Sequence, residues 1–150
     1  MEKDEHNLIT DKSMERFSIN TWVRLAHVYL KMTHAMTEHL RCWDISLAHF
    51  DVLMQVHEAE GLMQQELAHR LLVTKGNVCY LVDKLEQRQL LIRRNEGRVN
   101  HLFLSAQGRQ LLDEILPAHR KVVTALFAPL SYEDHSALLS SLRVLDKALG

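Results

Sequence analysis

Apolar residues recur every three or four positions along most of the chain, which is the period of an amphipathic α-helix. The longest such stretch runs from about residue 11 to residue 40. A second stretch begins after Ser46, which suits the N-cap position, and Gly61 is placed to end it. The apolar positions of the first stretch are Phe17, Trp22, Leu25, Tyr29, Met32, Met36 and Leu40. The pattern predicts a mainly α-helical protein.

Two short helices follow, separated by a tight turn. Leu67, Leu71 and Leu72 predict the first, and Thr74 suits the N-cap of the second. On a helical wheel one side of this second helix is apolar and belongs to the core: Val78, Leu81, Val82 and Leu85. The opposite side faces outward: Gly76, Tyr80, Asp83, Lys84 and Gln87.

Between residues 92 and 103 the period changes to that of β-strands. Two short strands are predicted around Asn95-Glu96-Gly97, a compact loop whose glycine can adopt a left-handed conformation. A hairpin after two helices across a tight turn describes a winged helix-turn-helix, at about residues 46–104. Such a motif presents one helix to a DNA groove and a loop to the flanking phosphates. The expected fold is therefore mainly α with a small β-wing.

Two further helices are predicted at the C-terminal end. Ser105 caps the first, in which Pro117 introduces a kink or a break. Ser131 with Asp134 resembles a capping box at the start of the last helix. The N- and C-terminal helices, at about residues 12–42 and 106–150, carry more apolar surface than the central motif can cover. We expect them to form a homodimer interface; the alternative is an intramolecular bundle.

The charge distribution favours a DNA-binding face. The whole chain has a net charge of only −1. Residues 74–109, however, hold seven basic and three acidic side chains, a net charge of +4, whereas residues 1–73 hold seven basic and eleven acidic ones, a net charge of −4. Positive charge is concentrated where the motif lies, as an electrostatic footprint on double-stranded DNA requires.

Several classes of protein are disfavoured. No apolar run approaches the roughly 20 residues of a membrane span. The acidic start of the chain is unlike a secretory signal, and Cys42 and Cys79 lack a metal-type pairing, so we expect a cytoplasmic protein without a membrane partner. The chain has no HExxH, glycine-rich phosphate loop or nucleophile elbow, so neither an enzyme, a catalytic residue nor a cofactor is expected. Residues 1–11 show no periodicity and are expected to be a flexible arm.

The outward side of the second short helix offers groups that read DNA. Asn77 can make paired hydrogen bonds to an adenine edge, and Thr74 at the helix N-terminus suits a phosphate. Tyr80 can reach a phosphate or a thymine methyl; alternatively, it packs on the wing. The candidate DNA-binding residues are Thr74, Lys75, Gly76, Asn77, Tyr80, Lys84, Arg93, Arg94, Arg98 and Asn100.

With these motifs the chain resembles the MarR family, the multiple-antibiotic-resistance regulators. The resemblance rests on the string from Thr74 to Leu91 and on Ile45-Ser46 with Phe50. It also rests on the spacing of Glu96, Arg98, Leu104-Ser105 and Gly108, which matches that of family wings. It covers nearly the whole chain and implies a single domain over residues 12–150. It further implies a homodimeric regulator, expected to be a repressor, that binds an inverted-repeat operator and is released by a small-molecule effector or a chemical signal.

The resemblance also assigns roles in the wing. It implies that Arg98 enters the minor groove or contacts its phosphates, steadied by Asp83 of the recognition helix, with Glu96 as a second supporting residue. The chain departs from the family pattern in places. Gln89 stands where glycine commonly ends the recognition helix, and Met63 stands where a small hydroxyl residue commonly caps the preceding helix. Asn77 and Tyr80 replace the usual Thr and Arg, which affects the operator sequence rather than the fold.

Other interpretations stay open. The motif can serve as a winged-helix module that binds protein. The ten histidines allow a metal-responsive regulator, although His34 and His39 are spaced i, i+5 and only His39 with Cys42 has a helical ligand spacing. Cys42 and Cys79 allow a redox-responsive one, or simply pack. A stripe that includes Trp22, Tyr29, Met32, Met36 and Trp43 can line an effector pocket or belong to the core.

Overall fold

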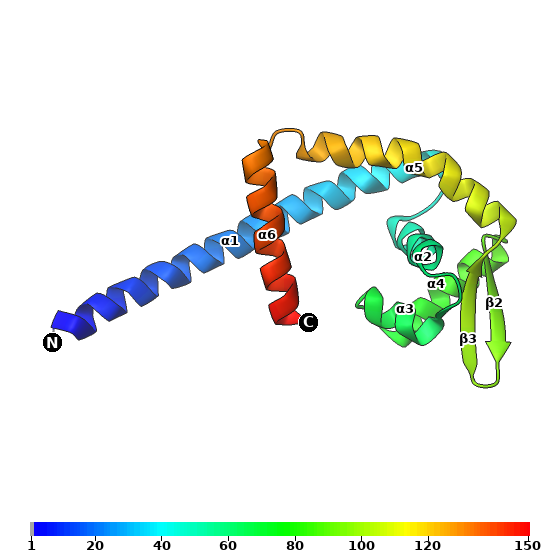
Figure 1. The fold of residues 1–150 in the computed structure, drawn as a ribbon, viewed down its shortest axis with the longest axis horizontal. Coiled ribbons are helices and arrows are strands. Elements are labelled where there is room, and N and C mark those ends of the chain that lie inside the picture. Colours follow the sequence, from blue (N-terminus) through cyan, green and yellow to red (C-terminus); the bar gives the residue numbers. More distant parts are fainter. Residues whose placement is uncertain (1) are drawn as a thin grey trace. The chain divides into compact units, whose positions relative to one another are not determined.

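The structure, a computed structural model, describes the backbone of residues 2–150 and the side chains of residues 11–150. The chain separates into two units, residues 1–38 and residues 39–150. Helix α1 (Glu2–Leu40) forms the whole described part of the first unit and ends in the second (Figure 1). Many of its large apolar side chains, Phe17, Trp22 and Tyr29 among them, are exposed.

Helix α1 begins earlier than the sequence pattern predicts. The expected arm at residues 1–11 showed no apolar periodicity, yet the backbone is helical from Glu2. Residues 2–11 contain neither glycine nor proline and include Glu, Lys and Leu, so a helix can continue through them without a buried stripe. Met1 and the side chains of residues 2–10 lie outside the described residues.

The second unit contains the helix-turn-helix, the wing and the C-terminal helices. After the 3₁₀ turn η1 (Arg41–Trp43), where Asp44 breaks the helix at a φ of 51°, the elements run in the order α2, β1, α3, α4, β2, β3, α5, α6. Their bounds are α2 Leu47–Glu58, β1 Leu62–Met63, α3 Gln64–Arg70, α4 Lys75–Gln87, β2 Leu91–Glu96, β3 Val99–Leu104, α5 Ala106–Phe127 and α6 Tyr132–Leu149. The fold is mainly helical with a small antiparallel sheet, as predicted.

The predicted N-caps are confirmed at four helices. The side-chain oxygens of Ser46, Thr74, Ser105 and Ser131 each accept a backbone N–H three residues further along. Ser131 also donates its hydroxyl to the Asp134 carboxylate at 2.8 Å. These contacts satisfy N–H groups that the first turn of a helix otherwise leaves without a partner.

Two predictions at helix ends were wrong. Helix α2 ends at Glu58, so Gly61, at a φ of 85°, lies in the turn before β1 rather than at the C′ position. Helix α3 ends at Arg70, and Leu72 is 88% exposed at a φ of 53° in the turn before α4. Leu72 continues the apolar spacing of Leu67, but a tight turn between two helices needs a left-handed residue there.

The wing belongs to a three-stranded sheet in the order β1-β3-β2. Leu62 pairs with Leu102 and Met63 with His101, a third strand too short for any sequence pattern to reveal. In the hairpin Glu96 pairs with Val99, so the loop is Gly97-Arg98 and not the predicted Asn95-Glu96-Gly97. Gly97 has a φ of 65° and Arg98 a negative one, as in a type II′ turn, which matches the twist of the strands.

The core lies between α2, α3, α4, the sheet and the first half of α5. The predicted apolar side of α4 is confirmed: Val78, Leu81, Val82 and Leu85 are all buried. Helix α5 is not split by Pro117 but continues to Phe127. Helix α6 has no buried residue, and Leu138, Leu139, Leu142 and Leu145 are each 38–49% exposed.

Candidate nucleic-acid interface

The outward side of helix α4 is open to solvent. Gly76, Tyr80, Asp83, Lys84 and Gln87 are all exposed, as the helical wheel predicts. A Cβ atom added to Gly76 would meet nothing within 4 Å, so the packing of the protein does not require glycine there. The absence of a side chain instead leaves the backbone open to close approach by a ligand.

The N-terminus of α4 is held by its cap. Thr74 Oγ1 accepts the N–H of Asn77 at 3.2 Å, and its hydroxyl proton can still be donated outward. Lys75 and Asn77 are exposed beside it. Exposed donors at the positive end of a helix form a site for a phosphate.

Tyr80 and Lys84 lie one turn apart on the exposed side of α4. The Lys84 Nζ atom is 5.7 Å from the centre of the Tyr80 ring, and Tyr80 is 58% exposed. The aromatic ring therefore contacts its own helix, and both polar ends remain accessible to a DNA backbone.

Arg93 at the base of the wing forms ion pairs with two carboxylates of α4. Its Nη2 atom contacts Asp83 Oδ1 and lies 3.0 Å from Glu86 Oε2. Its backbone N–H donates to Glu86 Oε1 at 3.2 Å. In the structure the wing partner of Asp83 is therefore Arg93 and not the expected Arg98, which lies in the hairpin turn at the end of the wing away from its base.

Other wing residues are partly engaged in contacts within the wing. The Arg94 guanidinium lies 4.6 Å from the centre of the Phe103 ring. Asn95 donates to Asn100 across the hairpin at 2.9 Å, in the pair predicted by the register. Arg98 is exposed and, among the described side chains, has no ion-pair partner.

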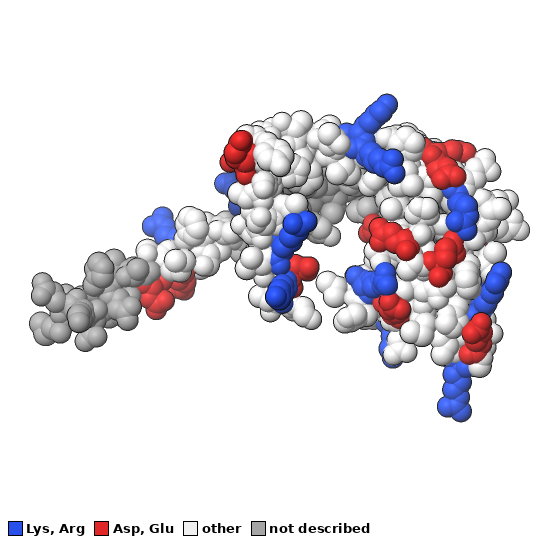
Figure 2. All heavy atoms as spheres, viewed as in Figure 1, with Lys and Arg blue, Asp and Glu red and all other residues white. Residues whose placement is uncertain are grey.

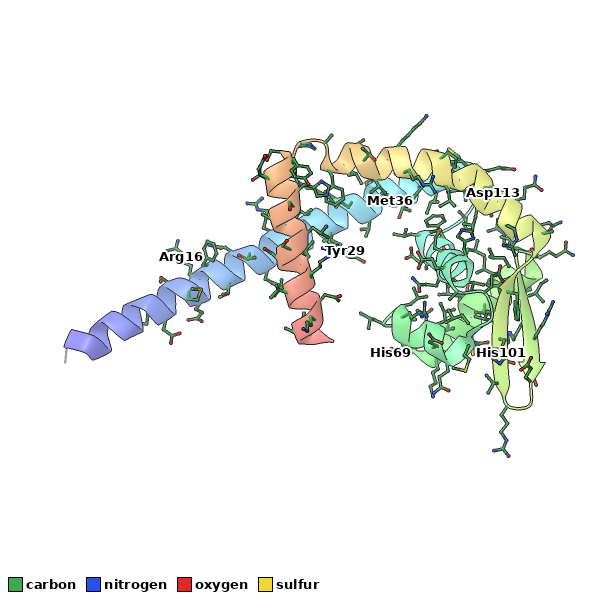
Figure 3. All side chains as sticks on the ribbon, viewed as in Figure 1. Arg16, Tyr29, Met36, His69, His101 and Asp113 are labelled. Atoms are coloured by element: carbon green, nitrogen blue, oxygen red, sulfur yellow. The ribbon has the colours of Figure 1, made fainter. Side chains whose placement is uncertain are left out.

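The inner end of the wing is tied to the loop before β1. His101, labelled on β3 in Figure 3, places Nδ1 2.9 Å from the carbonyl oxygen of Gly61. Its Nε2 atom lies 3.7 Å from Oε2 of Glu96, the second residue predicted to support the wing. Composition alone offered no signal for the roles of His101 and Glu86.

A cleft of about 210 Å³ separates the wing from the start of α4. It brings together three candidate DNA-binding residues, Lys75, Arg98 and Asn100, from elements far apart in the chain. Its other lining residues are Met63, Gln64, Gln65, Cys79 and Val99. Cys79 is exposed there, and its Sγ atom accepts a hydrogen bond from Gln64 Nε2 at 3.0 Å.

In Figure 2 blue atoms of basic side chains project beyond the free end of the wing, and red atoms of acidic side chains lie close above them. Two histidines outside the wing have lowered pKa values. For His49 on α2, burial is the largest cause, and the positive charges of Arg88 and Lys84 add to it. Burial and then His39 lower the pKa of His119. Among the described residues no group of three or more His, Cys, Asp or Glu side chains can hold a metal ion.

In the part of the chain that the structure describes, none of the helices has the length and apolar composition needed to span a bilayer. Two departures from the family pattern, at Gln89 and Met63, have structural counterparts near the motif. Gln89 adopts a φ of 58° where glycine would be unstrained. Met63 stands at the N-cap of α3 without a side-chain hydrogen bond.

Comparison with known proteins agrees with this geometry. The sequence profile of the MarR family matches residues 43–98, which hold the helix-turn-helix and the wing up to its turn. The HTH-type transcriptional regulator MhqR of Bacillus subtilis (strain 168) is 28% identical over 129 residues, which cover 84% of this chain and 86% of MhqR.

Two solved structures share the fold. AbsC, a MarR family transcriptional regulator from Streptomyces coelicolor, is similar with a TM-score of 0.80 and 21% identity, over 86% of this chain and 91% of AbsC. A cysteine-to-serine variant of MarR from E. coli, complexed with operator DNA, is similar with a TM-score of 0.76 and 23% identity, over 81% of this chain and 91% of MarR. Residues 43–98 thus match the MarR family, and the fold of the chain is that of MarR-family winged-helix transcriptional regulators.

Proposed function

We propose that this regulator is a cytoplasmic homodimer that represses transcription by binding an inverted-repeat operator, and that a small-molecule or chemical signal releases it. The observation that supports this most is the pairing of an exposed recognition face on α4 with an exposed Arg98 at the turn of the wing. One element suits a major groove and the other an adjacent minor groove.

The proposed contacts divide by chemistry. Asn77 and Tyr80 read base edges, and Gly76 lets the backbone come close to DNA. Arg98 enters the minor groove, where a narrow groove strengthens the negative potential. The phosphate contacts come from Thr74, Lys75, Lys84, Arg94 and Asn100.

The apolar surface of the flanking helices supports the homodimer. Helix α6 buries none of its residues within one chain, although Leu138, Leu142 and Leu145 recur at helical spacing. In α1, Phe17 and Trp22 are 70% and 69% exposed. Exposed apolar side chains on each of these helices support an interface, and the assembled dimer is where residues 12–150 would form one domain.

The twofold symmetry of the proposed dimer determines the symmetry of its operator. Two recognition helices related by a dyad read two half-sites one helical turn apart, so the preferred DNA is an inverted repeat. A dimer bound across a promoter blocks polymerase. An effector that changes the spacing of the two helices lowers operator affinity, with a coupling of about 1–3 kcal/mol.

Selection of bound fragments from the source genome, followed by gel-shift titration, tests the proposal. We expect enriched fragments to share an inverted repeat whose half-sites are about 10 base pairs apart, and scrambling either half to weaken binding at least tenfold. Sedimentation should give a dimer at the same concentrations. A monomer, or equal affinity for intact and scrambled sites, would overturn the proposal; capture of protein instead of DNA would indicate an interaction module.

A further inference from the structure

We propose that Arg93 is a positioning residue that fastens the wing to the recognition helix, so that the wing turn presents Arg98 to the groove. The inference rests on the proposed DNA-binding face and refines it. Sequence reasoning grouped Arg93 with the residues that contact DNA, but its surroundings in the structure give it a different task.

Two carboxylates on α4 hold the Arg93 guanidinium. Asp83 and Glu86 stand three positions apart, so they lie on one side of the helix one above the other. Arg93 Nη2 contacts Asp83 and is 3.0 Å from Glu86, and the Arg93 backbone N–H also donates to Glu86. A planar guanidinium can bridge two such acceptors in a fixed orientation, which a lysine ammonium cannot.

Among the three charged side chains of this cluster, that of Arg93 is the least exposed. The Arg93 side chain is 22% exposed, against 35% for Glu86 and 54% for Asp83. The Arg93 Nε atom is buried and has no hydrogen-bond partner among the described residues. One cation facing two anions leaves a local net charge of −1, so this cluster does not attract phosphate.

The position of the cluster explains what it controls. Only two residues separate Leu90, at the end of the recognition-helix segment, from Arg93 on β2. On the other side of the hairpin, β3 is held by β1. Strand β2 lies at the edge of the sheet and pairs with β3 on one side alone. Arg93 therefore fixes this edge strand to α4. With both strands held, the Gly97-Arg98 turn keeps one position relative to α4.

This role predicts an effect of unusual sign. Removing two negative charges from a DNA-binding surface ordinarily strengthens DNA binding. If Asp83 and Glu86 act by holding Arg93, the variant D83N/E86Q should instead bind the operator about fivefold more weakly, the order expected for partly exposed ion pairs. R93Q should weaken binding to a similar extent, and R93K should restore only part of it.

Salt dependence and coupling separate this role from a direct contact. R98A should reduce the slope of log K against log salt by about one, whereas R93Q should leave it unchanged. The triple variant R93Q/D83N/E86Q should bind no more weakly than R93Q, because all three changes remove the same interaction. Circular dichroism checks that each variant is folded.

A measurement without DNA completes the test. In R93Q the backbone amides of residues 95–100 should become more mobile in ¹⁵N relaxation, while those of R98A should not change. Stronger operator binding by D83N/E86Q, or a slope reduced by one in R93Q, would overturn the inference. So would an unchanged wing in R93Q. If no variant and no wild-type protein binds an inverted repeat, the proposed function fails, and the relaxation result still decides whether Arg93 orders the wing.

Discussion

Gly108 lies so close to Leu90 that a Cβ atom on Gly108 would stand 2.0 Å from the Leu90 carbonyl oxygen. This contact joins the start of α5 to the segment that leaves the recognition helix. The same carbonyl accepts the N–H of Ser105, the N-cap of α5. The glycine that sequence comparison placed at the end of the wing is thus required by packing and not by a turn.

A G108A variant should therefore be destabilised. The clash is with backbone, which cannot rotate away, so we expect a loss of about 3 kcal/mol in the free energy of unfolding, at the upper end for overpacking. Urea denaturation measures it. G76A is the matched control: its Cβ atom meets nothing within 4 Å, so stability should stay the same or rise by less than about 1 kcal/mol while operator affinity falls. Equal stability of G108A and wild type would contradict the packing described.

Acid should destabilise the protein through two histidines. Burial is the main cause that lowers the pKa of His49 and of His119 below the ordinary value of 6.5. In the unfolded chain these groups take up protons first as the pH falls below 6.5, so their contribution to stability is present above that pH and lost below it. The free energy of unfolding should drop between pH 7.5 and pH 5.5.

The variant H49Q/H119Q should show a smaller drop over the same range. Comparing the two proteins at equal pH cancels the opposite effect of Asp51, whose pKa is raised by burial. Identical pH profiles for variant and wild type would mean that neither histidine is protected from protonation in the folded state.

Alkylation should separate the two cysteines, although both are exposed. Cys79 lines the cleft with Lys75 and Arg98, so a maleimide group there fills space that DNA must enter. We expect C42S, which keeps Cys79, to lose operator binding at least tenfold on modification, and C79S, which keeps Cys42, to lose little. Mass spectrometry confirms labelling. Equal losses would show that the cleft does not face DNA.

The sequence predicted those parts of the fold that local chemistry determines. Thr74 and Ser105 cap helices because their side chains compete for N–H groups close by in the chain, and Val78 and Leu85 are buried because the helical period places them on one side. In contrast, β1 consists of two residues whose pairing depends entirely on β3. No local pattern reveals such a strand.

The sequence predicted which residues are exposed at the candidate site, but not which of their side chains form ion pairs with each other. Exposed residues such as Asn77 and Arg98 follow from helix and hairpin geometry. The partner of Asp83 does not, because Arg93 and Arg98 are both arginines of the wing and only the hairpin register decides which one lies beside α4. The predicted loop lies one to two residues before the observed turn, so the sequence pattern alone does not show that Arg98 belongs to the turn.

The central claim is that this winged helix binds duplex DNA through α4 and the wing turn. The salt dependence of operator binding by R98A tests this claim most directly. Against the selected inverted repeat, we predict weaker binding at every salt concentration and a slope of log K against log salt reduced by about one relative to wild type. An R98A protein with wild-type affinity and wild-type slope would contradict the account.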